Sequence, residues 1–196
     1  MSSSSPHHLI LGGQRSGKSR HAERLAQAWL SQAAGRAVTV LATAMACDDE
    51  MRDRIERHRQ DRPAGFGTLE EPYELGRALA EVSSPDRLVV VDCLTLWLTN
   101  VLMPATGEEG GHSQAHEVSP RAWSDVRASL LSTLAVLPGP VVLVSNEIGW
   151  GVVPLGAQVR HVVDELGRLN QDVAQACGQI TLMVAGQAWT RPVEPR

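Results

Sequence analysis

The sequence has few aromatic residues, few cysteines and no long apolar run. Its 196 residues include five Trp, one Tyr and one Phe, so we expect a core of Leu, Val, Ile and Ala. Three cysteines (Cys47, Cys93 and Cys177) show no CxxC spacing, which argues against a disulfide framework and favours a reducing cytoplasm. No apolar run approaches the roughly 20 residues of a membrane-spanning helix, so we expect no membrane span.

An excess of positive charge is also absent. Lys and Arg number 18 against 22 Asp and Glu, a formal net charge of −4, which argues against nucleic acid as a partner. A local phosphate site remains open, because it needs only a few donors. The length fits one domain, which we expect at residues 9–190 between a flexible N-terminal tail (1–8, with His7 and His8) and a C-terminal tail (191–196).

Strand and helix patterns alternate along the chain. Short β-branched runs such as Leu88–Val91 are typical of strands buried on both faces of a parallel sheet. We expect strands at 8–11, 37–42, 88–91, 141–144 and 180–184, helices at 19–33, 48–60, 74–82, 94–102, 121–137 and 156–177, and irregular structure around Phe66 and Pro72 and at 103–120 and 146–155. Strands separated by helices predict an α/β fold, a mainly parallel sheet with helices on both faces.

The most informative motif lies at residues 12–19, where GGQRSGKS matches the phosphate-loop (P-loop) pattern GxxxxGK[ST]. It follows a predicted strand and opens a predicted helix. Its glycines let backbone N–H groups point at phosphate oxygens, and the helix N-terminus adds partial positive charge. We expect Lys18 to reach the β- and γ-phosphates and the Ser19 hydroxyl to ligate Mg²⁺. The motif predicts a P-loop NTPase-like, RecA-like fold.

Acidic and amide side chains follow two of the predicted strands. Asp92 ends the strand at 88–91, where P-loop proteins hold Mg²⁺, although an Asp there also caps turns. The residues that follow give neither DxxG nor, after the strand at 141–144, NKxD, so a regulatory GTPase is disfavoured. Asn146 and Glu147 stand where parallel sheets bind ligands, and are candidates to orient Mg²⁺, water or substrate.

The predicted helix at 48–60 places Met51, Ile55 and His58 on one face. One interpretation is a histidine at the edge of the core on an amphipathic, salt-bridged helix. The other is a nucleophile, because the neighbouring arginines disfavour the protonated imidazole and a neutral imidazole nitrogen attacks phosphorus. The spacing alone is compatible with both.

Five stretches occur in order along the chain: GGQRSGKSRHAE, ATAMACDDEMRDRIERHRQDRP, VDCLTLWLTN, VSNEIGWGVVP and GRLNQ. Together they closely resemble the bifunctional adenosylcobinamide kinase/adenosylcobinamide-phosphate guanylyltransferase family of cobalamin biosynthesis. The resemblance runs from Leu9 to Ala185, and its most specific part is the second stretch, which contains His58.

The resemblance implies two reactions. The chain would phosphorylate adenosylcobinamide with ATP or GTP, then transfer GMP from GTP to the product through a guanylyl-histidine at His58, giving adenosylcobinamide-GDP. Lys18 and His58 would be catalytic, with Ser19 and Asp92 as Mg²⁺ ligands, although relatives can carry Glu at the Asp92 position. The implied nucleotide contacts are Gly12, Gly13, Gln14, Arg15, Ser16, Gly17, Lys18, Ser19, Arg20, Thr43, Ala44, Met45, Ala46, Arg59, Gln60, Asp61, Arg62, Glu70 and Asp92. A homo-oligomer, a trimer, is also implied.

Two other functions stay open from the residues alone. One is a P-loop kinase for another small molecule, with His58 structural; the other is a RecA-like ATP-binding assembly protein. The sequence also leaves open whether one nucleotide site or two serve the reactions, the choice of ATP or GTP in the kinase step, and the general base of that step.

Weaker signals also have two interpretations each. His112 and His116 are a candidate zinc pair. They lie in the Gly-rich segment 103–120, and this segment either covers the corrinoid site or is a tolerated insertion. Trp150, between two glycines, either flanks the corrinoid or packs in the fold.

Overall fold

A seven-stranded sheet organises the described residues of the computed structural model, which are 5–46, 49–50, 52–53, 56, 65–103 and 123–194. The strands are β1 (His8–Gly12), β2 (Ala37–Ala42), β3 (Phe66–Glu70), β4 (Arg87–Asp92), β5 (Val141–Val144), β6 (Gln179–Val184) and β7 (Gln187–Pro192). Their order is β3-β2-β4-β5-β1-β6-β7; β6 and β7 pair antiparallel, and the other neighbouring pairs of described strands are parallel.

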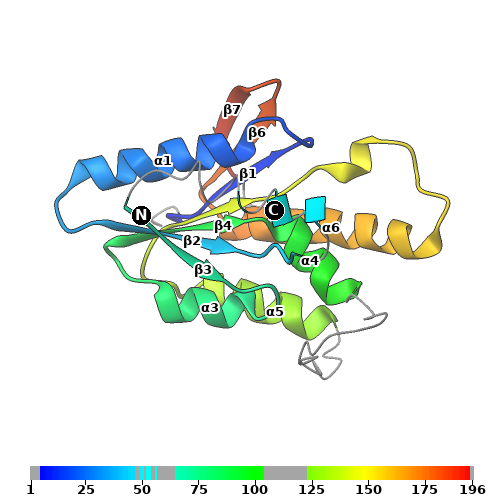
Figure 1. Cartoon of the computed structure of the whole chain (residues 1–196), viewed down its shortest axis with the longest axis horizontal. Helices are drawn as coiled ribbons and strands as arrows, with labels where there is room; N and C mark the ends of the chain where they lie inside the picture. Colours follow the sequence, from blue (N-terminus) through cyan, green and yellow to red (C-terminus); the bar gives the residue numbers. More distant parts are fainter. Residues whose placement is uncertain are drawn as a thin grey trace.

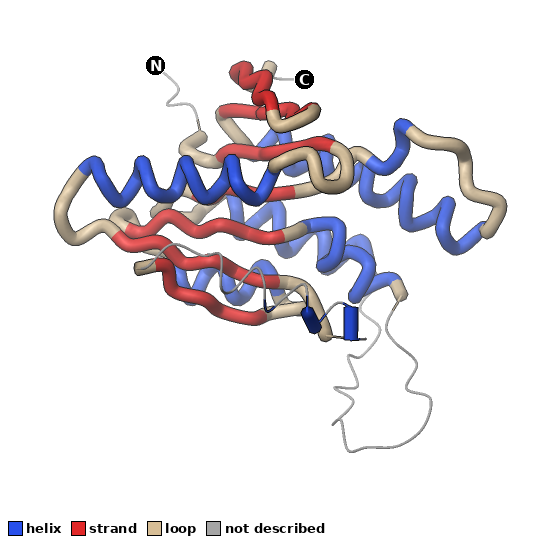
Figure 2. Tube along the Cα trace, turned by 45° about the horizontal axis from the view of Figure 1, so that its top comes forward, coloured by secondary structure: helices blue, strands red, loops and turns tan. Residues whose placement is uncertain are grey.

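Helices cover both faces of this sheet (Figures 1 and 2). They are α1 (Lys18–Gln32), α3 (Leu75–Val82), α4 (Leu94–Leu102), α5 (Trp123–Leu134) and α6 (Ala157–Ala176), with a 3₁₀ turn, η1 (Ile148–Trp150). Alternate strand residues serve the two faces: Leu9 and Leu143 face the cluster built with α3–α6, whereas Ile10 and Val144 face the cluster built with α1. The predicted α/β class, mainly parallel with helices on both faces, is confirmed.

Two strands were missed by the sequence prediction. β3 lies in the stretch expected to be irregular, and β7 follows the strand expected to be the last. Both are at the edges of the sheet and largely exposed. Neither therefore carries the continuous apolar run that marks a strand buried on both faces.

The hairpin that joins β6 to β7 explains the second omission. Its two central residues, Ala185 and Gly186, have φ values of 51° and 78°. Positive φ at both positions gives the turn whose twist matches the paired strands, but the usual sequence signal is Asn-Gly or Asp-Gly. An Ala in the first position gave no such signal.

The expected N-terminal tail is wrong at its inner end. β1 begins at His8, and both His7 and His8 are buried. His7 Nδ1 accepts a hydrogen bond from the backbone N–H of Val141 at 3.2 Å, so Nε2 donates to the carbonyl oxygen of Leu134 at 2.8 Å. These bonds tie the start of β1 to its neighbours. At the other end β7 runs to Pro192, past the expected start of the C-terminal tail at residue 191.

Part of the predicted histidine helix at 48–60 lies outside the described residues. Asp49, Glu50, Arg52, Asp53 and Glu56 are described, and each is helical. The greater part of the predicted loop at 103–120, with both of its histidines, also lies outside the described residues. None of the described helices is long and apolar enough to cross a membrane.

Candidate functional site

The P-loop connects the end of β1 to the start of α1 at the carboxyl edge of the sheet. Gly12 has φ 151°, and a Cβ on this residue would lie 2.4 Å from the carbonyl oxygen of Met183, so only glycine fits. Gly17 precedes the helix with φ 99°, a left-handed conformation that glycine adopts without strain. The loop thus reaches the N-terminus of α1 in a path that its glycines make possible.

Lys18 turns its side chain back over this loop. Its Nζ donates hydrogen bonds to the carbonyl oxygens of Gly12 at 3.0 Å and Gly13 at 2.6 Å, and the residue is buried. The ammonium group is therefore held on the loop, beside the N-terminus of α1. Positive charge and backbone N–H groups at one helix N-terminus favour an anion.

Asp92 reaches the P-loop from the end of β4, although β5 separates β4 from β1 in the sheet. The Ser19 hydroxyl points at Asp92 Oδ1 over 3.5 Å, which is long for a hydrogen bond between oxygens. A hydroxyl and a carboxylate are oxygen ligands of the kind that Mg²⁺ prefers, and Mg²⁺ usually completes its shell with phosphate oxygens and water. The described residues contain no group of three or more His, Cys, Asp and Glu side chains suited to a metal.

Around these residues lies a cavity of about 230 Å³, which we call the P-loop cavity. It is lined by residues 14–20 of the loop and by Asp92, Cys93, Val144 and Asn146 from the ends of β4 and β5. Two of its buried oxygens, Ser16 Oγ and Asn146 Oδ1, have no hydrogen-bond partner among the described residues. Since buried polar atoms are normally paired, these two fit a polar ligand in the cavity.

Asn170 on α6 holds the segment after β5 against this cavity. Its Oδ1 accepts a hydrogen bond from Ser145 Oγ at 2.7 Å, and its Nδ2 donates to the carbonyl oxygen of Asn146 at 3.0 Å and to Glu147 Oε1 at 3.3 Å. The N–H of Glu147 in turn donates to the carbonyl oxygen of Gly12 at 3.4 Å. The position of Asn146 after a strand was the signal for it in the sequence. Asn170 belongs to the stretch GRLNQ, but its place in the middle of a helix did not predict these contacts.

Cys93 lines the P-loop cavity beside Asp92, yet it is a poor nucleophile. Burial, followed by the nearby Asp92 charge, raises the pKa of its thiol to about 11. The thiol is therefore protonated at neutral pH, and nucleophilic attack needs the thiolate.

The segment after β2 lies further along the same edge of the sheet. The Thr43 hydroxyl donates to the carbonyl oxygen of Cys93 at 2.7 Å and accepts from its N–H at 2.9 Å, so this side chain fixes the end of β4. Ala44, Met45 and Ala46 follow, and the Tyr73 hydroxyl lies 3.1 Å from Met45 Sδ.

Glu70 is the last residue of β3 and pairs with Ala42 on β2. Four strand spacings separate β3 from β1, or about 19 Å at about 4.8 Å each. The structure thus groups Ser19, Lys18 and Asp92 and leaves Glu70 apart from them. The other expected contacts, His58 and Arg59, Gln60, Asp61 and Arg62, lie outside the described residues.

Comparison with known proteins gives a family and close relatives. The model of the family described as cobinamide kinase / cobinamide phosphate guanyltransferase matches residues 8–190. The bifunctional adenosylcobalamin biosynthesis protein CobP of Pseudomonas aeruginosa is 46% identical over 187 residues, covering 95% of this chain and 98% of that protein. The bifunctional adenosylcobalamin biosynthesis protein CobU of Salmonella typhimurium is 38% identical over 180 residues, covering 91% and 95%.

Solved structures resemble the chain more distantly. The flagellar accessory protein FlaH from Methanocaldococcus jannaschii has a TM-score of 0.47 at 11% identity, covering 98% of this chain and 80% of that one. A second solved structure, an ATPase domain, has a TM-score of 0.46 at 14% identity, covering 90% and 68%.

Proposed function

The chain belongs to the cobinamide kinase / cobinamide phosphate guanyltransferase family, and we propose that its P-loop cavity and His58 divide the work of the two reactions between them. It is a bifunctional enzyme of adenosylcobalamin biosynthesis, a kinase and a guanylyltransferase. The observation that carries the proposal is the convergence of Lys18, Ser19 and Asp92 on one cavity with unpaired buried oxygens.

In the kinase step, the P-loop amides and Lys18 bind the phosphates of ATP or GTP. The hydroxyl of adenosylcobinamide attacks the γ-phosphorus, the bond to the β–γ bridging oxygen breaks, and a nucleoside diphosphate leaves. Lys18 then stabilises the charge that develops on the transferred group. Its bonds to the Gly12 and Gly13 carbonyl oxygens support this role, because they hold the ammonium group on the phosphate loop.

Ser19 and Asp92 would hold Mg²⁺ in this step. Their paired oxygens and the cavity beside them suit a hard cation. Bound there, Mg²⁺ would neutralise charge on the β- and γ-phosphate oxygens.

In the guanylyl step, His58 is the nucleophile. A neutral imidazole nitrogen attacks the α-phosphorus of GTP, the bond to the leaving oxygen breaks, and pyrophosphate departs. A phosphate oxygen of adenosylcobinamide phosphate then attacks the same phosphorus and releases the imidazole, which gives adenosylcobinamide-GDP. This covalent route divides one difficult transfer into two easier ones. We propose that Arg59 and Arg62, with Gln60 and Asp61, contact the nucleotide here.

The nucleoside is the part of the substrate that Thr43–Ala46 and Glu70 would contact. These residues lie at the ends of β2 and β3, on the same edge of the sheet as the P-loop. The separation of about 19 Å between β1 and β3 favours an extended nucleotide or a second nucleotide position for the guanylyl step.

We also propose that the chain forms a homo-oligomer and is located in the cytoplasm. The exposed edge strand β7 carries Trp189, and an exposed edge pairs readily with another chain, which supports a homo-oligomer. We propose a trimer, as the family resemblance implies. The free thiols of Cys93 and Cys177 support a reducing compartment. Light scattering on the purified protein tests the trimer.

Transfer from γ-labelled ATP tests the kinase role. With adenosylcobinamide present, we expect label on the corrinoid, and a loss of about 100-fold or more in rate in Lys18→Met. Nucleotide consumed with another acceptor but never with the corrinoid would favour a different small-molecule kinase. Nucleotide binding without any transfer would favour an assembly protein.

A further inference from the structure

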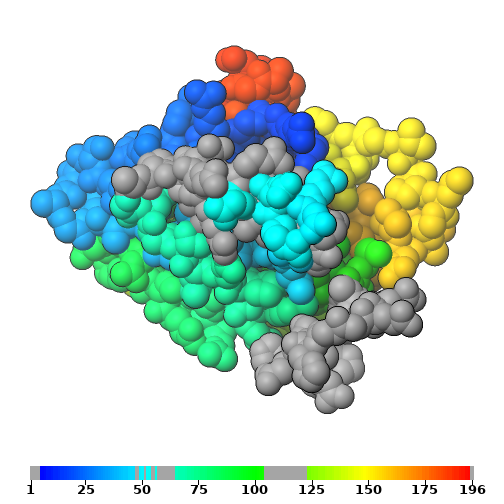
Figure 3. All heavy atoms as spheres, viewed as in Figure 1, coloured from blue at the N-terminus to red at the C-terminus, as the bar shows by residue number. Residues whose placement is uncertain are grey.

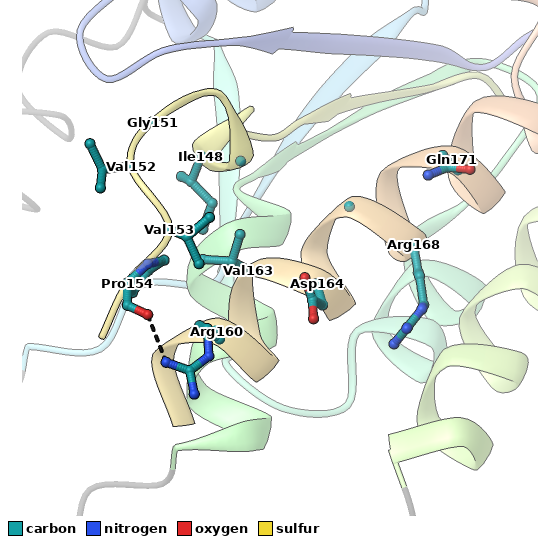
Figure 4. A pocket seen from close by; sticks show the side chains of 12 residues that line it. Ile148, Gly151, Val152, Val153, Pro154, Arg160, Val163, Asp164, Arg168 and Gln171 are labelled. Atoms are coloured by element: carbon teal, nitrogen blue, oxygen red, sulfur yellow. Dashed lines mark hydrogen bonds between the residues drawn. The ribbon is translucent and has the colours of Figure 1, made fainter. Parts of the chain in front are cut away.

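A second, larger cavity lies beside the P-loop cavity. Its volume is about 560 Å³, and it runs between the segment at 148–154 and the exposed side of α6; we call it the α6 groove. In Figure 3 the yellow atoms of this region project from the molecule and enclose a hollow. Figure 4 shows Ile148, Val153 and Val163 pointing toward one another at one end, with Asp164, Arg168 and Gln171 along α6. The groove is thus apolar on one side and polar on the other.

Gly167 leaves this groove open. It lies inside the 20-residue helix α6, where Gly costs about 1 kcal/mol relative to Ala. A Cβ on Gly167 would meet no atom within 4 Å among the described residues. The glycine is therefore not required by close packing or by the backbone, and a large side chain at this position would have to project into the groove.

The opposite wall exposes large apolar side chains. Val153 is 72% exposed and Val152 96%. Just outside the groove, Trp150 is 69% exposed and Leu155 99%. Arg160 holds this wall in place, since its Nη1 donates to the carbonyl oxygens of Pro154 and Leu155. Apolar surface fixed in this exposed position is typical of a binding site.

The segment that follows β5 connects the α6 groove to the P-loop cavity. Asn146 lines the P-loop cavity, Ile148 lines the α6 groove, and Glu147 stands between them. Asn170, next to the groove residue Gln171, fixes both Asn146 and Glu147. Figures 1 and 2 both draw the segment after β5 beside the P-loop. Only Glu147 separates, along the chain, a residue that lines the P-loop cavity from one that lines the α6 groove.

We infer that the α6 groove binds one edge of the corrin ring of adenosylcobinamide, with the hydroxyl to be phosphorylated directed past Glu147 toward the P-loop; this rests on the proposed function. A corrin has apolar faces and methyl groups with amide side arms around its rim. Ile148 and the valines of the groove would contact the apolar faces and methyl groups of the corrin. Arg160, Asp164 and Gln171 would form hydrogen bonds with its amide side arms. The rival occupant is a second copy of the chain.

Filling the groove from α6 tests this inference. Gly167→Phe places a ring in the open space, whereas Gly167→Ala adds a methyl group that the space accepts. We expect Gly167→Phe to raise the Kd of adenosylcobinamide in equilibrium dialysis by about tenfold or more, with the Kd of ATP unchanged and Gly167→Ala like the wild type. Circular dichroism checks that both variants are folded.

A second pair of variants addresses the opposite wall without touching buried residues. Val153→Asp puts a charge into the groove, and Leu155→Asp puts the same charge just outside it. Weaker corrinoid binding in Val153→Asp alone supports the inference. Equal effects in both variants would overturn it.

Different results would overturn the inference about the α6 groove and the proposed function of the chain. If the wild type binds and phosphorylates adenosylcobinamide and Gly167→Phe binds it equally well, the groove is not the corrinoid site. If Gly167→Phe keeps its corrinoid affinity but changes its molar mass in light scattering, the groove is a contact between copies. If the wild type does not act on the corrinoid at all, the proposed function itself fails.

Discussion

The hydroxyl of Ser19 lies 3.5 Å from Oδ1 of Asp92, although the two residues are 73 positions apart. One belongs to the first turn of α1 and the other ends β4, and the two elements meet only because β1 and β4 run parallel with their carboxyl ends together. The two residues proposed as Mg²⁺ ligands are thereby brought to one cavity.

Asp92→Asn should weaken the binding of Mg²⁺ at the proposed site. The amide keeps the size of the side chain but removes its negative charge, so the Mg²⁺ concentration for half-maximal kinase activity should rise about tenfold or more. Asp86→Asn, an exposed change at the opposite end of β4, is the matched control. An unchanged Mg²⁺ titration in Asp92→Asn would remove Asp92 from the metal site.

Asn170→Asp should disrupt the segment that follows β5. A carboxylate still accepts from Ser145 but no longer donates to the carbonyl oxygen of Asn146 or to Glu147, and it adds a like charge beside Glu147. We expect the free energy of unfolding to fall by about 1–3 kcal/mol, together with a lower kcat for the kinase step. Gln158→Glu, an exposed change on the same helix, should leave both unchanged.

Buried histidines at the start of β1 predict a loss of stability in acid. Burial, with a smaller contribution from the charge of His21, lowers the pKa of His8 to about 4, and burial likewise lowers the pKa of His7. A lowered pKa in the folded state means that the neutral rings stabilise the fold above pH 6.5. This stability is lost as the pH falls from 6.5 toward 4, by about 3 kcal/mol for His8.

Urea unfolding at pH 7.5 and at pH 4 measures this loss. His8→Gln, which still has a hydrogen-bonding group for Thr181, should remove most of its share of the pH dependence. His161→Gln, at an exposed position of α6, serves as the control and should keep the full dependence. Equal stability of the wild type at both pH values would contradict the assignment of neutral buried rings.

The sequence predicts the parts of this fold whose signals are local. The strands β2 and β5 were predicted at their observed bounds, because β5 is an unbroken apolar run and only Thr39 interrupts the apolar run of β2. The P-loop motif likewise predicted the turn from β1 into α1. The edge strands β3 and β7 were missed because one side of each faces solvent, and His7 was assigned to a tail because its partners lie 127 and 134 positions away.

The residues of the site likewise differ in how far the local sequence predicted them. Lys18 and Ser19 were named from a contiguous motif, and Asp92 from its place at the end of a strand. Asn170 and Gly167 both belong to the stretch GRLNQ of the family resemblance, but no role was predicted for either, because their surroundings depend on what the fold brings next to α6. Contacts of this kind are set by the packing of distant segments.

Covalent labelling with α-labelled GTP tests the role of His58 most directly. We predict that the wild type, incubated with Mg²⁺, acquires a label that is stable in base, labile in acid and released by adenosylcobinamide phosphate. His58→Ala should remain unlabelled while it still phosphorylates adenosylcobinamide, and His161→Ala should label like the wild type. A wild type that never labels, or a label that persists in His58→Ala, would contradict the guanylyl-histidine at His58.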